Sequence, residues 1–280
     1  MKVFSWDDVL NSKAKEFIHT LYSGEIAGSA LTVGGFDGPH RGHETVCRRV
    51  TEAARKRSLV PGLITFTHSP RSFKQKAEYE GDISSLRLRL KVFEEWGFAF
   101  AVVIDFSADF SKMEGYAFLT VLKECCLMRF FGVGEGFRCG HNHATGETDI
   151  RQFAEVHGIE CDFAALQADA GSRISSSAVR RYIRAGKLDK AAQFLGRPFD
   201  IDCLLFDIEK QRGKTVVLRP RAEHLQLLPP DGIYAADVFA SVHNTKLCFY
   251  TDLHSASSVL RLEVPDADTD YRFDKIRFKM

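Results

Sequence analysis

The sequence predicts an α/β protein in which a parallel sheet, flanked by helices, is followed by a smaller and mostly antiparallel β domain. Short β-rich runs alternate with helical patterns as far as Gly196, and after it the β-rich runs follow one another without long helical segments between them. The chain has 280 residues, of which 45% are apolar and 27% are charged, so it can bury a sizeable core. This composition excludes disordered, collagen-like and coiled-coil chains.

The predicted strands of the first part are residues 30–34, 62–66, 100–105 and 130–134. The predicted helices are residues 44–56, 86–93 and 116–126. In the first of these helices Val46 and Val50 lie four residues apart, and in the second Leu86, Leu90 and Phe93 have the spacing of one helix face. Strand and helix in this order give right-handed βαβ units, and therefore a parallel sheet with helices on both faces.

The second part contains further β-rich runs, at residues 201–208, 215–218, 232–239, 245–250 and 259–264. Prolines interrupt this part repeatedly, as is typical of turns between short strands. A unit of this size and pattern predicts a small antiparallel sheet or a partial barrel. We therefore expect two domains, residues 1–197 and residues 198–280.

Charge and cysteine usage limit the partners and the compartment that we expect. The 38 Lys and Arg residues are nearly balanced by 37 Asp and Glu residues, so bulk charge favours neither nucleic acid nor an anionic membrane as a partner. The 7 cysteines show no framework spacing, and residues 1–17 have no apolar run of signal-peptide type. The longest apolar stretch, residues 98–104, is far shorter than a membrane span. We expect a cytoplasmic protein with reduced thiols.

The most specific pattern is LTVGGFDGPHRGHETVCRRV, residues 31–50. A β-rich run ends at Val33, glycines follow at positions 34, 35 and 38, and His40 and His43 stand where the next helix should begin. Glycine lets the backbone approach a ligand closely, and a helix N-terminus offers unpaired N–H groups and partial positive charge. Residues three apart on a helix share one face. The pattern favours a polyphosphate site in which both imidazoles donate to phosphoryl oxygens.

Three segments together resemble a known family. The segment GGFDGPHRGH resembles the first signature of the bacterial FAD synthetases, the nucleotidyltransferase half of the bifunctional riboflavin kinase/FAD synthetase family. VGEGFRCG, residues 133–140, resembles a turn of that family, and residues 174–199 resemble its serine-rich segment, helix and hinge. The match covers about residues 28–200 in the right order. It implies a Rossmann-like HxGH nucleotidyltransferase domain followed by a reduced riboflavin-kinase-like barrel.

The resemblance implies transfer of AMP from ATP to FMN, which gives FAD and pyrophosphate with the help of Mg²⁺, the reaction of an FMN adenylyltransferase (EC 2.7.7.2). It makes His40 and His43 the catalytic residues. The residues that it assigns to ATP are Gly34, Phe36, Gly38, His40, His43, Ser176, Ser177 and Arg180. For FMN it suggests Phe36 and Asp37. Residues 175–177 also form a serine cluster that can cap the following helix, and both roles are compatible.

The chain departs from the family pattern at three positions near this site. Gly35 stands where the family usually has Asn, and Gly136 stands where it usually has Asp or Asn. The second signature, commonly F-x-P-H-P, is here FTHSP, so that His68 is displaced by one residue and Ser69 takes the usual position of the histidine. In a strand, a slip of one residue turns a side chain to the other face. We expect these changes to affect rate and substrate preference.

The second domain departs further from the resemblance. Residues 228–234, LPPDGIY, resemble the P-x-G-x-Y strand entry of the family's riboflavin kinase barrel. A PTAN-type motif and a catalytic Glu are not recognisable in residues 199–280. We therefore expect that riboflavin phosphorylation is absent.

Two other functions are compatible with the sequence. One is a nucleotidyltransferase for another phosphorylated acceptor, since HxGH serves many acceptors. The other is a non-catalytic protein that binds flavin or nucleotide, which the three departures near the site favour. Cys139, His141 and His143 have donor atoms for a metal, but three donors in one glycine-bounded loop lack a fourth ligand. We predict no metal site in the protein itself.

Overall fold

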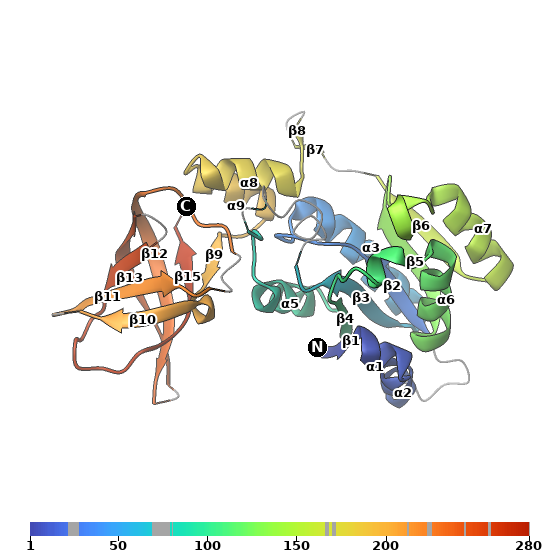
Figure 1. The fold of residues 1–280 in the computed structure, drawn as a ribbon, viewed down its shortest axis with the longest axis horizontal. Helices are drawn as coiled ribbons and strands as arrows, with labels where there is room; N and C mark the ends of the chain where they lie inside the picture. The colour runs from blue at the N-terminus through green and yellow to red at the C-terminus, as the bar shows by residue number, and fades with distance from the viewer. Residues whose placement is uncertain are drawn as a thin grey trace. The chain divides into compact units, whose positions relative to one another are not determined.

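A computed structural model describes residues 1–21, 28–68, 79, 81–165, 168–169, 172–211, 213–222, 226–243, 245–256 and 259–279. Packing divides the chain into two compact units (Figure 1). The first unit comprises Met1–Phe36, Gly42–Ala77 and Leu90–Arg173, and the second comprises Asp37–Arg41, Glu78–Arg89 and Ile174–Met280. The boundary after residue 197 stays a prediction. Packing groups the helices just before it with the antiparallel sheet.

The first unit is built on a six-stranded sheet in the order β1-β4-β3-β2-β5-β6. All of its ladders are parallel, as predicted. The strands are β1 (Lys2–Ser5), β2 (Ser29–Val33), β3 (Val60–Phe66), β4 (Phe100–Ile104), β5 (Met128–Gly134) and β6 (Glu160–Ala164). Every residue of β2 is buried, which fits a central strand that is covered on both faces.

The helices that cover this sheet are α1 (Trp6–Leu10), α2 (Lys13–Thr20), α3 (Arg41–Lys56), α5 (Leu86–Glu95), α6 (Gly115–Cys125) and α7 (Glu147–His157). Neighbouring residues of one strand point to opposite faces. Leu31 of β2 accordingly packs in a cluster with residues of α1, α2, α6 and α7, whereas Ala30 packs in a second cluster with residues of α3 and α5. The sheet therefore has helices on both faces, as the alternating pattern predicts.

The side of β2 on which the chain adds its next strands changes part-way through the sheet. From β2 the chain passes to β3 and β4 on one side, and later to β5 and β6 on the other. In open parallel sheets, ligands bind beyond the carboxyl ends of the strands at such a reversal. The two strands that flank the reversal end at Val33, directly before the first family-like segment, and at Gly134, within the second.

The second unit is built on a seven-stranded sheet in the order β10-β11-β14-β13-β12-β15-β9. Its ladders are all antiparallel, and the sheet curls as a half barrel (Figure 1). The strands are β9 (Asp200–Asp202), β10 (Phe206–Lys210), β11 (Thr215–Pro220), β12 (Gly232–Val242), β13 (Thr245–Ala256), β14 (Val259–Glu263) and β15 (Arg272–Phe278). The predicted mostly antiparallel β domain is confirmed.

One predicted strand of this sheet is wrong. Residues 201–208 form two strands, β9 and β10, separated by the 3₁₀ turn η3 (Cys203–Leu205). The carboxylate of Asp202 accepts a hydrogen bond from the backbone N–H of Leu204 at 3.1 Å, and this contact turns the chain out of the first strand. An alternation of apolar residues does not reveal such a local side-chain contact.

Two helices, α8 (Ser176–Arg184) and α9 (Leu188–Leu195), belong to the second unit. Val179 and Ile183 of α8 and Phe194 of α9 share one buried cluster with residues of the antiparallel sheet. The short strands β7 (Ala168–Asp169) and β8 (Ser172–Arg173) pair with each other, and the 3₁₀ turns η1 (Phe110–Lys112) and η2 (His141–His143) complete the elements of the described residues. The face of α8 that does not pack in this cluster is exposed to solvent.

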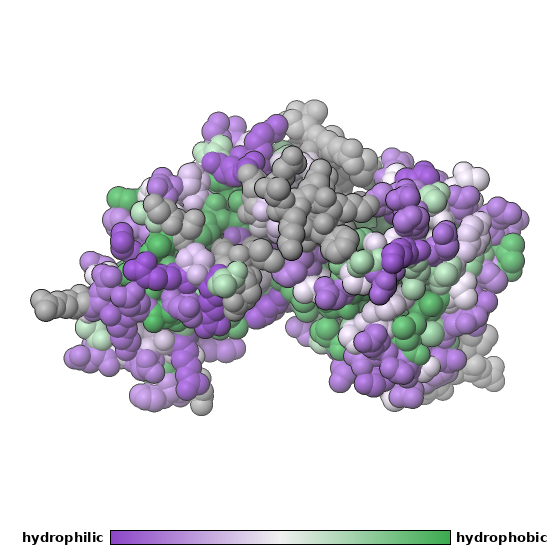
Figure 2. Space-filling view, in the orientation of Figure 1, coloured by the Kyte–Doolittle hydropathy of each residue, from purple (hydrophilic) through white to green (hydrophobic). Residues whose placement is uncertain are grey.

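The visible surface is mostly hydrophilic, with apolar residues scattered among polar ones (Figure 2). Scattered apolar residues are normal on a folded protein. In the described part of the chain, no helix is both long and apolar enough to cross a membrane.

Candidate functional site

The loop after β2 begins with Gly34, which lies close to the ring of Phe36. The backbone N–H of Gly34 donates to the carbonyl oxygen of Ile64 at 3.1 Å, and the hydroxyl of Thr65 donates to that of Gly35 at 3.4 Å. A Cβ atom on Gly34 would lie 2.9–3.1 Å from the ring of Phe36. A side chain at position 34 would therefore require the ring of Phe36 to move.

Phe36 packs within the first unit. It has a backbone φ of +45°, and only 6% of the residue is exposed. The ring lies edge-on to His43, with centroids 5.1 Å apart, and also contacts Phe93 at 5.5 Å. Edge-on aromatic contacts of this kind stabilise the orientation of both rings. Phe36 therefore holds the imidazole of His43 in place, and its contact with a substrate ring stays a prediction.

Asp37 belongs to the second unit and accepts three hydrogen bonds from other residues of that unit. One carboxylate oxygen accepts from the backbone N–H of Ile83 at 2.6 Å, and the other accepts from the guanidinium of Arg180 at 2.6 Å. The carbonyl oxygen of Asp37 accepts from the hydroxyl of Ser176 at 2.8 Å. Arg180 also donates to the carbonyl oxygen of Gly81. Two of the predicted phosphate-binding residues, Ser176 and Arg180, thus fix the conformation of the loop.

Gly38 follows in a backbone conformation with φ of +56°, which favours glycine. A Cβ atom here would lie 2.5 Å from Cγ2 of Ile83. Asp37 itself is 7% exposed. Burial, together with the negative charge of Asp82, raises its pKa to about 6, although Arg180 and the N–H of Ile83 favour the charged form.

His40 lies directly before α3, which begins at Arg41. The two histidines therefore do not share a helix face, and that expectation is wrong: only His43 belongs to the first turn of α3. His40 is 4% exposed. Burial, assisted by the positive charge of Arg197, lowers its pKa from 6.5 to about 4. The imidazole is consequently neutral at pH 7, and it can donate one hydrogen bond without carrying charge.

The serine-rich segment forms the beginning of α8. The hydroxyl of Ser175 accepts from the backbone N–H of Ala178 at 3.3 Å, so Ser175 is the N-cap that the sequence predicts for this cluster. Ser177 is exposed. It lines a surface hollow of about 500 Å³ together with Arg180, Arg181, Arg184 and Ala185. A hydroxyl and three guanidinium groups around one hollow favour an anion.

The structure also places the residues that depart from the family pattern. Gly136 has φ of +76° in the turn after β5, a conformation that favours glycine over the usual Asp or Asn. His68 follows β3, where the backbone N–H of Thr67 donates to the carbonyl oxygen of Ile104 at 2.9 Å. Ser69 lies outside the described residues.

The Cys139-to-His143 loop has structural contacts of its own. Cys139 and Thr145 form a β-bridge, and the ring of His141 contacts the carbonyl oxygen of Ser111 at 2.9 Å. The guanidinium of Arg138 donates to the carbonyl oxygen of His143 at 2.6 Å. Among the described residues, no three His, Cys, Asp or Glu side chains gather as a metal site.

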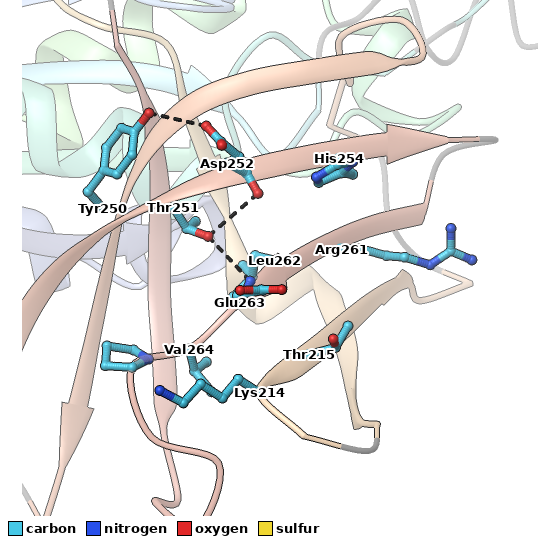
Figure 3. A pocket seen from close by; sticks show the side chains of 11 residues that line it. Lys214, Thr215, Tyr250, Thr251, Asp252, His254, Arg261, Leu262, Glu263 and Val264 are labelled. Carbon is cyan, nitrogen blue, oxygen red and sulfur yellow. Dashed lines mark hydrogen bonds between the residues drawn. The ribbon is translucent and has the colours of Figure 1, made fainter.

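A second hollow, of about 770 Å³, lies on the antiparallel sheet (Figure 3). Its charged and polar lining includes Lys214, Tyr250, Asp252, Arg261 and Glu263. The hydroxyl of Tyr250 donates to Asp252 at 3.1 Å. The lining mixes both signs of charge, and it includes none of the residues that the sequence assigns to substrates.

Comparison with known proteins identifies the family of the chain. Residues 23–178 match the sequence profile described as FAD synthetase, which is more than half of the chain. The chain belongs to the FAD synthetase family. This membership confirms the resemblance of the sequence motifs and the prediction of a nucleotidyltransferase.

Relatives of the family support this placement. A bifunctional riboflavin kinase/FMN adenylyltransferase of Escherichia coli K12 is 28% identical over 225 residues, which cover 79% of this chain and 71% of the relative. The protein of the same name from Haemophilus influenzae is 28% identical over 218 residues, covering 76% and 70%. The solved structure titled macrolide-efflux protein from Streptococcus pneumoniae has a TM-score of 0.73 at 21% identity and covers 90% of this chain and 92% of its own. At that identity the likeness shows a shared fold.

Several residues of the site escape sequence reasoning. Tyr79, Asp82, Arg197 and Gln226 each make a buried or half-buried polar contact in the second unit. Arg197, for example, donates to the carbonyl oxygen of Pro39. These residues lie in loops or turns and form no periodic pattern, so no local signal in the sequence identifies them. Only the fold brings them to the loop.

Proposed function

We propose that this chain is an FMN adenylyltransferase, which transfers AMP from ATP to FMN and releases pyrophosphate. The observation that carries the proposal is the glycine-rich loop with its two histidines, placed directly after the central strand β2 at the reversal of a parallel sheet. Membership of the FAD synthetase family supports the same reaction. The curated relatives are named for both FMN adenylyltransferase and riboflavin kinase activity.

The reaction requires little covalent chemistry from the protein. An oxygen of the FMN phosphate attacks the α-phosphorus of ATP, a new P–O bond forms, and the bond from the α-phosphorus to the bridging oxygen breaks. The electron pair of that bond leaves with pyrophosphate. Negative charge develops on the phosphoryl oxygens and on the leaving group, so positioning and electrostatic stabilisation supply most of the catalysis.

The two histidines donate to different oxygens of the triphosphate in this proposal. His43 sits in the first turn of α3, where the helix dipole and the contact with Phe36 orient its ring. His40 is neutral before ATP binds, because burial lowers its pKa, and the added negative charge of a phosphate favours its protonated form. A proton held near the leaving group offsets charge where it develops.

The remaining assignments place the phosphates beside the loop and α8. The backbone at Gly34 and Gly38 approaches the nucleotide, and Ser177 and Arg180 bind phosphate oxygens. Ser176 and Arg180 also hold Asp37, so that phosphate binding and loop conformation are linked. Mg²⁺ enters as the Mg-ATP complex, whose phosphate oxygens are suitable ligands for that ion. We propose a cytoplasmic location, as the cysteine usage suggests, and no nucleic-acid partner, as the balanced charge suggests.

We further propose that this chain does not phosphorylate riboflavin. The sequence of the antiparallel sheet shows neither a PTAN-type motif nor the expected catalytic Glu. Conversion of riboflavin to FMN by the purified protein with Mg-ATP contradicts this part of the proposal.

One assay tests the main proposal against its alternatives. The purified protein is incubated with Mg-ATP and either FMN or riboflavin, and the flavins are separated by chromatography. FAD formed from FMN supports the adenylyltransferase. Binding of FMN and ATP without product favours a non-catalytic binding protein, the alternative that Gly35 and Gly136 support. ATP binding without flavin binding favours a nucleotidyltransferase for another acceptor.

A further inference from the structure

We infer that Gln226 is a positioning residue for ATP binding, through which the antiparallel sheet holds the loop Asp37–Arg41. The inference rests on the proposed function, because it assumes that this loop contacts the nucleotide. All of the contacts that carry it lie within the second unit. It gives the antiparallel sheet a role that does not depend on phosphorylating riboflavin.

The side chain of Gln226 is 3% exposed and makes three hydrogen bonds to backbone groups. Its amide oxygen accepts from the N–H of Asp202 at 2.9 Å. Its amide nitrogen donates to the carbonyl oxygens of Ile83 and Asp200, at 3.1 Å and 2.7 Å. A buried amide that is satisfied in this way fixes the segments that it joins.

The segment around Ile83 connects Gln226 to the loop. The carbonyl oxygen of Ile83 accepts from Gln226, while its N–H donates to the carboxylate of Asp37 at 2.6 Å. The side chain of Ile83 also occupies the space where Gly38 would carry a Cβ atom. One residue is thus held from one side by Gln226 and touches the loop from the other. A shift of Ile83 would move Asp37 and, through it, Arg180.

The other end of this connection is fixed to the sheet. The carboxylate of Asp202, 2% exposed, accepts from the hydroxyl of Ser85 at 2.5 Å and from the guanidinium of Arg87 at 2.5 Å. Arg87 also pairs with Asp274 of β15. Strand β9 is therefore attached both to β15 and to the start of α5. Gln226 sits against a rigid support, as a residue that positions a loop requires.

The expected consequence is a change in ATP affinity. A loop that is ordered before binding loses less conformational entropy when the ligand arrives. Replacing Gln226 by Met keeps its approximate length and removes all three hydrogen bonds. We expect the Kd for Mg-ATP to rise about tenfold, since net hydrogen bonds of ordinary strength each change a binding constant several-fold.

The test compares Gln226→Met with Gln193→Met, a matched control at an exposed position of α9. Calorimetry gives the Kd for Mg-ATP, steady-state assays give KM and kcat, and urea unfolding reports stability. A raised Kd and KM for ATP with little change in kcat supports the inference. The inference is contradicted if Gln226→Met binds ATP with unchanged affinity and its kcat falls only because less of the protein is folded. Gln226→Leu, which also removes the three hydrogen bonds and buries no charge, is a second variant, and urea unfolding reports whether it is folded.

The two proposals fail in distinguishable ways. Wild-type protein that binds ATP but forms no FAD contradicts the adenylyltransferase and leaves the Gln226 comparison readable from the Kd alone. Wild-type protein that forms FAD, with equal ATP affinity in the wild type and in Gln226→Met, contradicts only the role of Gln226. Failure of the wild type to bind ATP contradicts both.

Discussion

The burial of His40 predicts a specific dependence of stability on pH. The pKa of this residue falls from 6.5 to about 4 on folding. Between these values the unfolded chain binds a proton at His40 that the folded chain does not, so stability falls as pH is lowered through this window. At about 1.36 kcal/mol per pKa unit the full effect is about 3 kcal/mol, of which about 2 kcal/mol develops between pH 7 and pH 5.

The substitution His40→Gln removes this proton and keeps a polar side chain of similar size. The free energy of unfolding is measured in urea at pH 7 and pH 5 for the wild type, for His40→Gln, and for His19→Gln at an exposed position of α2. We expect the wild type and the His19 variant to lose about 2 kcal/mol more on acidification than His40→Gln. Asp37, whose raised pKa acts with the opposite sign, is present in all three proteins and cancels. Equal losses in the three proteins would refute the reasoning.

Three further substitutions test the loop and its support. Gly38→Ala places a Cβ atom against Ile83 at a positive φ, and we expect urea unfolding to show a loss of about 1–3 kcal/mol. Phe36→Leu removes the ring that lies against His43, and we expect a loss of about 1 kcal/mol together with a lower kcat for FAD formation. Arg180→Lys keeps the charge but loses the planar fork that reaches two acceptors, so calorimetry should show a several-fold weaker affinity for ATP.

The sequence predicts four of the six strands of the first unit, β2 to β5, because their apolar runs are long and buried. The predicted residues 30–34 and 130–134 fall within one or two residues of β2 and β5. Parallel pairing follows from the alternation of strands with helices. The N-terminal elements β1, α1 and α2 are not predicted, since their residues carry charge throughout and give weak periodicity. Strand β6, most of whose residues are only half-buried, is not predicted either.

The site is predictable in its residue types but not in their environments. The glycine spacing and HxGH pattern identify the loop at residues 34–43. The partners of Asp37 lie 46 and 143 positions away in the sequence, at Ile83 and Arg180, so only the tertiary fold reveals them. The burial that makes His40 neutral arises in the same way. The local sequence pattern therefore locates the loop, but it does not determine whether a side chain such as His40 is charged.

The most direct test of the central claim is the single-turnover rate of AMP transfer at saturating Mg-ATP and FMN, measured for the wild type and His43→Ala. The wild type should form FAD, and the variant should form it about 10²–10³-fold more slowly, as expected when a donor to developing charge is lost. Circular dichroism and urea unfolding confirm that the variant is folded. A folded His43→Ala protein that forms FAD at the wild-type rate contradicts the claim that this loop stabilises the transferring phosphoryl group.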